Sequence, residues 1–184
     1  MEIKKSIEKD VEWSLSQEDP NPNNAHRYVY SPTSIEVETA KNPISREKVV
    51  MVDAINHALN EEMDLNPKMI IYGQDIADPK GGVFTATKGL SSKYGKDRVF
   101  NSPLAESSII GTAIGLAVTG YKPVVEIQFA DYIWTAMMQI RNEVVTMRYR
   151  SNNLWECPLI IRAPVGGYIT VSYTHLTLPT SVIV

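Results

Sequence analysis

One carboxylate stands alone in an uncharged stretch of the chain, in a position suited to acid–base chemistry. The stretch runs from Asn101 to Gly120, and Glu106 is its only charged residue. A helix that begins near Glu106 would favour the carboxylate anion through its N-terminal dipole. Apolar surroundings would favour the neutral acid and raise its pKa. A carboxyl balanced between these states can exchange a proton near neutral pH. The alternative is an ordinary glutamate in the first turn of a helix.

A second group of candidates lies at the end of the apolar strand predicted at residues 123–129. Alternate residues of a strand point to opposite faces, so Glu126 and Gln128 would share one face. At the strand end, Gln128 could form a flat slot with the aromatic rings of Phe129 and Tyr132. Such a slot suits a planar heteroaromatic ring. The alternative is core packing with one polar residue at the end of a strand.

Two glycines in the stretch after Glu106 allow a close approach to one helix face. Gly111 and Gly115 are four residues apart and therefore share that face. Each costs about 0.8–1 kcal/mol in a helix interior. Close approach of another backbone or a ligand is the usual compensation. A subunit interface on this helix, in a non-catalytic assembly domain, is therefore a second functional hypothesis.

The segments that must position these residues alternate between strands and helices. This order predicts an α/β fold with a parallel sheet covered by helices on both faces. Ligands of such sheets bind beyond the carboxyl ends of the strands, where Gln74, Asp75, Glu106 and Gln128 all fall. Strands are expected at 69–72, 98–100, 123–129 and 158–162, and helices at 90–95, at 106–119, in a stripe from Ile133 to Met147, and from a Ser45 cap to Met63.

The N-terminal part of the chain differs from this α/β pattern. Apolar residues recur every fourth position from Ile3 to Leu15, which predicts a short amphipathic helix. Residues 20–45 hold four of the eleven prolines and predict an extended arm. The predicted organisation is an N-terminal helix and Pro-rich linker over residues 1–45, followed by the α/β domain.

Composition excludes several classes of protein. Of 184 residues, 43% are hydrophobic and 21% charged, which is typical of a globular protein. The net charge of −3 argues against nucleic-acid binding, which needs a basic face. The single cysteine excludes an intrachain disulfide, and no histidine has metal-ligand spacing to another, so no metal ligand is predicted. Without a signal peptide or a long apolar span, the sequence predicts a cytoplasmic protein with no membrane partner.

Several motifs together resemble a known family. In order and spacing they are similar to the beta subunit of the thiamine-diphosphate-dependent 2-oxo acid dehydrogenase component, with the branched-chain (2-oxoisovalerate) type closest. The resemblance covers about Arg46 to Ile169, and the charged helix and arm before it resemble the junction of forms in which alpha and beta subunits are fused. The motifs are Gly73-Gln-Asp75, Lys80-Gly-Gly-Val-Phe84, Lys88-Gly-Leu90, Asn101-Ser-Pro-Leu-Ala-Glu106, Gly111-x-x-x-Gly115, Glu126-Ile-Gln-Phe-Ala-Asp-Tyr132 and Arg148-Tyr-Arg-Ser151.

The resemblance implies a transketolase-like pyrimidine-binding domain over residues 46–169 and roles for the candidate residues. Glu106 would bond N1′ of the aminopyrimidine of thiamine diphosphate and promote its imino tautomer, which removes the C2 proton of the thiazolium. The carbanion would attack the 2-oxo acid, CO₂ would leave, and the acyl group would pass to lipoyl. Gln128, Phe129 and Tyr132 would line the cofactor and substrate pocket. A pyruvate or acetoin enzyme, or a transketolase-like paralogue, stays open.

The resemblance also implies partners. An alpha subunit or fused alpha domain would supply the Mg²⁺ and diphosphate site, whose Gly-Asp-Gly motif is missing from this sequence. Further implied partners are a homo- or hetero-oligomer formed across the pyrimidine domains and a lipoyl-bearing acyltransferase.

The end of the sequence departs from the family. After Ile169 the family continues with a Tyr-His-Ser-Gln segment, and the neighbours of His175 do not match it. We therefore predict no role for His175, and a tail of doubtful origin over residues 170–184. The domain would be incomplete, and this chain alone is therefore expected to be inactive. Its open sheet edge and uncovered apolar surface would make it poorly soluble or partly unfolded.

Overall fold

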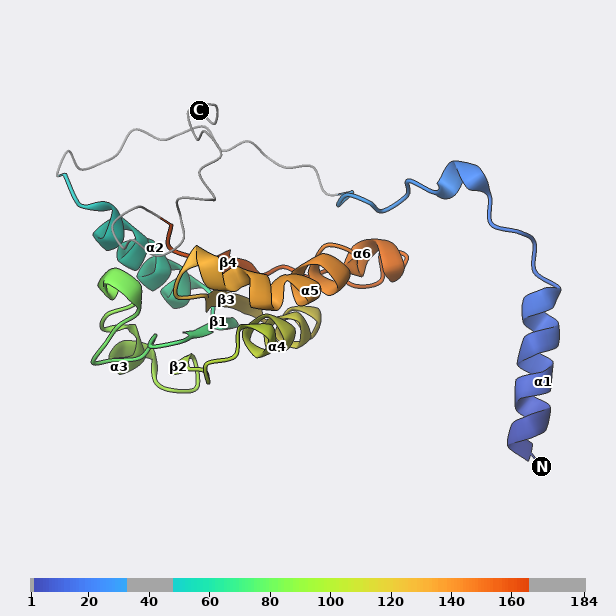
Figure 1. Ribbon diagram of the computed structural model, residues 1–184, viewed down its shortest axis with the longest axis horizontal. Helices are drawn as coiled ribbons and strands as arrows, with labels where there is room; N and C mark the ends of the chain where they lie inside the picture. Colours follow the sequence, from blue (N-terminus) through green and yellow to red (C-terminus); the bar gives the residue numbers. More distant parts are fainter. Residues whose placement is uncertain (1, 33–47, 166–184) are drawn as a thin grey trace.

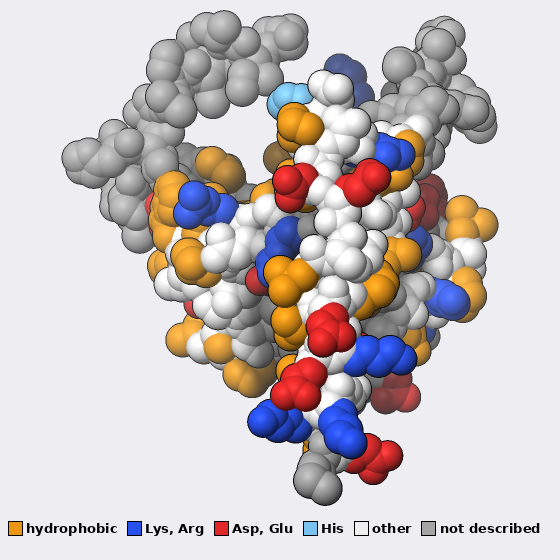
Figure 2. Space-filling model, turned by 90° about the vertical axis from the view of Figure 1, so that its right-hand side faces the viewer, with side chains coloured by type: hydrophobic (Ala, Val, Ile, Leu, Met, Phe, Trp, Pro, Cys, Tyr) orange, Lys and Arg blue, Asp and Glu red, His pale blue; other side chains and the backbone are white. Residues whose placement is uncertain are grey.

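The computed structural model describes residues 2–32 and 48–165 (Figure 1). The predicted N-terminal helix is confirmed as α1, Glu2–Leu15, and a short 3-10 turn, η1, follows at Pro22–Asn24. No residue of α1 is buried, and Figure 2 shows acidic and basic side chains beside hydrophobic ones along it. Most of the predicted arm, the tail at 170–184 and His175 lie outside the described residues.

The predicted parallel sheet is confirmed. Its strands are β1 (Met69–Gly73), β2 (Val99–Asn101), β3 (Lys122–Glu126) and β4 (Ile160–Arg162), in the order β2-β1-β3-β4. Gly73 pairs with Asn101 on one side and with Glu126 on the other, and Glu126 pairs with Arg162. The carboxyl ends of all four strands are therefore level, and the residues that follow them meet at one edge.

Helices cover both faces of the sheet, as the alternating pattern predicts. On one face, α2 (Met51–Leu65) and α3 (Leu90–Tyr94) pack against Met69 and Ile71 of β1. On the other face, α4 (Glu106–Val118) and the 3-10 segment η3 (Ala130–Ala136) pack against Ile70 and Tyr72. Figure 1 shows the two groups of helices on opposite sides of the strands.

One contact between strands fixes the spacing at the functional edge. A Cβ atom on Gly73 would lie 2.4 Å from the carbonyl oxygen of Glu126, so only glycine allows β1 and β3 to approach this closely. Beside it, the hydroxyl of Tyr72 donates a hydrogen bond of 2.9 Å to the carbonyl of Ile109 in α4. This bond joins the sheet to the helix that begins at Glu106.

Two boundaries differ by three residues or more from the predictions. Helix α2 begins at Met51 after an extended Val50, so the predicted start at Ser45 is wrong; Ser45 itself lies outside the described residues. Strand β3 ends at Glu126 instead of residue 129, because its neighbour β4 ends at the paired Arg162. Gln128 therefore follows the strand, and the argument that it shares a strand face with Glu126 fails.

The continuous helical stripe predicted from Ile133 to Met147 is also wrong. The chain instead forms η3, a short α5 (Met137–Gln139), a π-helical turn η4 (Ile140–Val144) and α6 (Met147–Arg150). In the π-helical turn, the N–H of Val145 bonds the carbonyl of Ile140, five residues back. This wider turn interrupts the 3.6-residue period on which the prediction depended.

Candidate functional site

Glu106 is the first residue of α4 and lies at the carboxyl edge of the sheet, half-buried. The chain enters the helix through Ala105, which is not helical and provides no side-chain cap. The carboxylate of Glu106 accepts a hydrogen bond from its own backbone N–H. It is thus held at a helix N-terminus, where the dipole favours its negative charge.

Two side chains from other elements hold the two oxygens of this carboxylate. The amide Nε2 of Gln74, directly after β1, donates to Glu106 Oε1 over 3.2 Å. The Thr135 hydroxyl in η3 lies 3.0 Å from Glu106 Oε2 and 2.8 Å from the carbonyl of Tyr132. Its single proton serves one of these two acceptors at a time. Glu106 therefore takes a fixed orientation from groups that follow β1 and β3.

The predicted rise in the pKa of Glu106 is wrong for this chain. Burial is the largest single influence on the carboxyl and favours the neutral acid. The hydrogen bonds from its backbone N–H, from Gln74 and from Thr135 together outweigh burial and hold the pKa of Glu106 below its ordinary value. In this state the group is a carboxylate, so it is an acceptor for a proton.

Gln128 is held by the residue that follows Gln74. Its Nε2 donates to Asp75 Oδ2 over 2.9 Å, and Lys80 Nζ lies 3.2 Å from the same oxygen. Asp75 has a left-handed backbone with φ of 58°, and its carbonyl accepts the N–H of Gly82. Two successive residues, Gln74 and Asp75, therefore bind the two predicted polar groups of the site.

The two predicted aromatic residues lie together but do not form parallel walls. The rings of Phe129 and Tyr132 meet edge to face, with centroids 5.9 Å apart and planes at 85°. Phe129 is half-buried, whereas Tyr132 is exposed. The carbonyl of Tyr132 is the second acceptor of the Thr135 hydroxyl, so these rings connect to Glu106 through η3. One ring could stack on a planar ligand while the other contacts its edge.

The sequence predicted four residues of this site but not the hydrogen bonds that hold them. The four are Glu106, Gln128, Phe129 and Tyr132. Gln74 and Asp75 were expected at the ligand-binding edge of the sheet, but their bonds to Glu106 and Gln128 had no signal in the sequence. Thr135 was not predicted, because it lies in a segment predicted to be a regular helix.

A buried ion pair lies behind the site. Glu126, 1% exposed, accepts the N–H of Val83 over 3.1 Å through Oε1, and its Oε2 bonds the guanidinium of Arg162. Burial raises the pKa of Glu126, while the charge of Arg162 and the bond from Val83 act in the opposite direction. This pair joins β3, β4 and the loop around η2 (Val83–Thr85).

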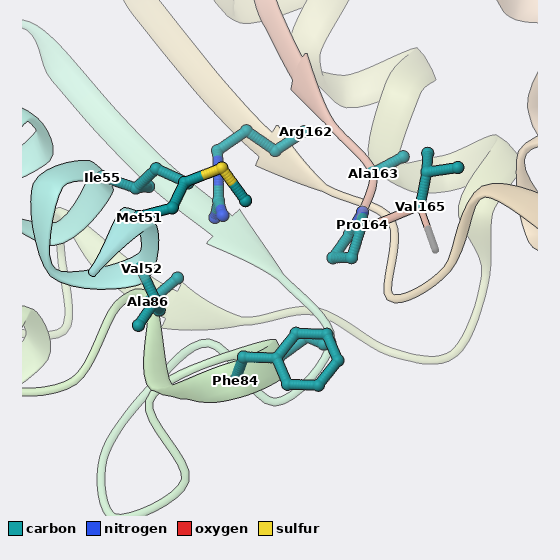
Figure 3. A pocket seen from close by; sticks show the side chains of 10 residues that line it. Met51, Val52, Ile55, Phe84, Ala86, Arg162, Ala163, Pro164 and Val165 are labelled. Atoms are coloured by element: carbon teal, nitrogen blue, oxygen red, sulfur yellow. The ribbon is translucent and has the colours of Figure 1, made fainter. Parts of the chain in front are cut away.

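A cavity of about 430 Å³ opens beside this ion pair (Figure 3). Arg162 contributes its only charged side chain, and the other walls are apolar. The candidate residues Glu106, Gln128, Phe129 and Tyr132 do not line it. Its lining is Met51, Val52, Ile55, Val83, Phe84, Ala86, Arg162, Ala163, Pro164 and Val165.

Across residues 2–32 and 48–165, three or more His, Cys, Asp or Glu side chains nowhere gather in a way that could hold a metal ion. Within the same ranges, every helix is too short or too polar to cross a membrane.

A family model described as transketolase, pyrimidine binding domain, matches residues 47–175. The chain is 48% identical over 124 residues to 2-oxoisovalerate dehydrogenase subunit beta of Bacillus subtilis (strain 168), covering 67% of this chain and 38% of that protein. It is 41% identical over 128 residues to pyruvate dehydrogenase E1 component subunit beta of the same organism, covering 70% and 39%. Identity to the pyruvate dehydrogenase E1 component subunit beta of Mycoplasma pneumoniae is 42% over 124 residues, covering 67% and 38%. The chain thus spans about two fifths of the length of the curated relatives it matches.

Proposed function

The chain belongs to the transketolase pyrimidine-binding domain family, and from this we propose that its Glu106 edge binds the aminopyrimidine ring of thiamine diphosphate. The observation that carries this proposal is the position of one oriented carboxylate at the carboxyl edge of a parallel sheet. The resemblance to beta subunits of 2-oxo acid dehydrogenases supports it. In such sheets this edge is where ligands bind.

The side chains present fit an aminopyrimidine. Its ring nitrogens and amino group need a hydrogen-bonding acid and amide groups, and its faces need apolar or aromatic contact. Glu106 offers a carboxyl group that can take up a proton, and Gln74 and Gln128 offer amides. The buried Oε1 of Gln74 has no partner among the described residues and leaves an acceptor for a donor. Phe129 and Tyr132 offer the aromatic surface.

In the proposed reaction, Glu106, a carboxylate in the free protein, takes up a proton and shares it with ring atom N1′. Gln74 and Thr135 keep its carboxylate in place, so little reorientation is needed when the proton moves. Gln128, Phe129 and Tyr132 orient the ring and exclude water from it. When bound, thiamine diphosphate supplies the carbanion chemistry that cleaves a 2-oxo acid. An alpha subunit or fused alpha domain would hold the diphosphate and Mg²⁺.

We propose that the intact protein is the decarboxylating component of a 2-oxo acid dehydrogenase complex. It would oxidatively decarboxylate a branched-chain 2-oxo acid and pass the acyl group to a lipoyl-bearing acyltransferase. The identity of 48% to a 2-oxoisovalerate dehydrogenase subunit, against 41% to a pyruvate dehydrogenase subunit, supports the branched-chain substrate. Turnover of 3-methyl-2-oxobutanoate and of pyruvate by the intact enzyme tests this choice; a higher kcat/KM for pyruvate would contradict it.

Binding of thiamine diphosphate to the intact protein, with its alpha part and Mg²⁺, tests the site itself. Isothermal titration calorimetry should give saturable binding that weakens when Phe129 is replaced by alanine, because the ring loses one aromatic contact. An exposed aromatic away from the edge provides the control, and Tyr149→Ala should bind as the wild type does. Absence of binding by the intact wild-type protein would instead favour the assembly-domain hypothesis, for which the exposed face of α4 around Gly115 is the supporting observation.

A further inference from the structure

Gln74 is a buried amide that lies between the sheet and Glu106. The residue is 4% exposed, and its Nε2 donates to Glu106 Oε1 over 3.2 Å. Its Oε1 is buried and has no hydrogen-bond partner among the described residues. The preceding Gly73 is fixed by pairing to both neighbouring strands, so the backbone of Gln74 has little freedom to move away. A buried acceptor without a donor is unusual, and this oxygen is free to accept a hydrogen bond if the amide turns.

An amide can pair with a carboxyl in either protonation state. A glutamine side chain carries N–H donors at one atom and an acceptor oxygen at the other. While Glu106 is a carboxylate, it can only accept, and the Nε2 of Gln74 is the atom that faces it. When Glu106 is protonated it has an O–H to donate. A half-turn of the Gln74 amide would then place Oε1 opposite this donor.

We propose that Gln74 is the positioning residue of Glu106, and that its amide serves both protonation states of the carboxyl. It donates to the anion and accepts from the acid, so the carboxyl keeps one orientation while its proton moves. This inference rests on the proposed function, in which Glu106 shares a proton with its ligand. The titratable groups on the two segments that contact Glu106 are Asp75, beside Gln74, and Asp131 and Tyr132 in η3.

The first test follows the pKa of Glu106 in the intact protein without thiamine diphosphate. Infrared spectra recorded across pH report its carboxyl band, which is identified by its loss in Glu106→Gln. Gln74→Met keeps the length of the side chain and removes both polar atoms. It should raise the pKa of Glu106 by about 0.5–1 pKa unit, because the anion loses a donor. Gln139→Met is the matched control, since Gln139 also has a buried amide oxygen without a partner in the part of the chain that the structure describes, but does not bond Glu106.

The second test asks whether Gln74 acts through Glu106. In the wild-type background, Gln74→Met should lower kcat for 2-oxo acid decarboxylation about 10-fold. In the Glu106→Gln background, the same substitution should change the residual rate less than about 2-fold. Gln74→Glu, which has no donor when ionised, should also raise the pKa of Glu106, and it provides a second variant if Gln74→Met does not fold.

Two results would overturn the inference. One is an unchanged pKa of Glu106 in both Gln74 variants. The other is a fold-loss of kcat on Gln74→Met that is as large in the Glu106→Gln background as in the wild-type background. Failure of the wild-type protein to bind thiamine diphosphate would refute the proposed function instead, and the infrared test on the cofactor-free protein would still decide the role of Gln74.

Discussion

Replacing Asp78 by asparagine should destabilise the fold in a manner that depends on pH. The carboxylate of Asp78 accepts hydrogen bonds from the backbone N–H groups of Gly89 and Ser92 and from the hydroxyls of Ser91 and Ser92. These bonds tie the loop after β1 to the N-terminus of α3. In Asp78→Asn, an NH₂ group would face the Ser92 N–H, and two donors would oppose each other.

The expected loss of folding stability in Asp78→Asn follows from the pKa of Asp78. The bond from the Ser92 hydroxyl, followed by that from the Gly89 N–H, lowers it from 3.8 to about 2. At 1.36 kcal/mol for each pKa unit, this difference corresponds to at most about 2.4 kcal/mol of folding stability. The group is only partly buried, so solvent screening reduces the expected effect to about 1–2 kcal/mol.

Folding lowers the pKa of Asp78, and this direction fixes the sign of the pH dependence of stability. A carboxyl whose pKa is lowered on folding contributes stability that is fully present above pH 3.8 and is lost as pH falls through about 2. Urea unfolding of the intact protein at several pH values should therefore show a gap in unfolding free energy between wild type and Asp78→Asn. This gap should be constant near pH 7. The gap should shrink between about pH 4 and 2.

The control for this measurement is Asp97→Asn, which removes the same charge from an exposed position. It should change the unfolding free energy by less than about 0.5 kcal/mol. A gap for Asp78→Asn that is absent at pH 7, or that stays constant down to pH 2, would refute the assignment of stability to this carboxylate.

Two further predictions concern the core behind the site. Gly73→Ala should lower the unfolding free energy by about 2–3 kcal/mol, because its Cβ would meet the Glu126 carbonyl at 2.4 Å and force β1 and β3 apart; a change below 0.5 kcal/mol in urea would contradict this. Glu126→Gln should cost about 2–4 kcal/mol by leaving the guanidinium of Arg162 uncompensated, and adding Arg162→Met should recover most of the loss. Equal losses in the single and double variants would count against the ion pair.

The sequence predicts the sheet well because its strands are short apolar runs bounded by turn residues. Met69–Gly73 and Ile160–Arg162 fall within one or two residues of their predicted ends. Boundaries set by tertiary contacts were not predictable. Strand β3 ends at Glu126 because its partner ends there, and the π-helical turn at Ile140–Val144 interrupts a stripe that looked regular.

The candidate site also contains residues that the sequence predicts and residues that only the fold brings together. Glu106 was found because it is alone in an uncharged stretch, which is a property of the sequence. Its partners Gln74 and Thr135 lie 32 and 29 residues away along the chain, and only the sheet and η3 bring them together. Their hydrogen bonds also explain why the predicted direction of the Glu106 pKa was wrong. A sequence indicates burial more readily than it indicates which donors reach a carboxylate.

In the proposed function, Glu106 holds and transfers a proton at a bound aminopyrimidine. The decisive experiment is single-turnover decarboxylation of 3-methyl-2-oxobutanoate by the intact enzyme, compared between wild type and Glu106→Gln. The variant should bind thiamine diphosphate and keep its unfolding midpoint, because glutamine preserves the shape of the side chain. Its rate should fall by about 10²–10⁴-fold, since an amide cannot give and take the proton. A folded, cofactor-loaded variant that decarboxylates within about 3-fold of the wild-type rate would contradict the account.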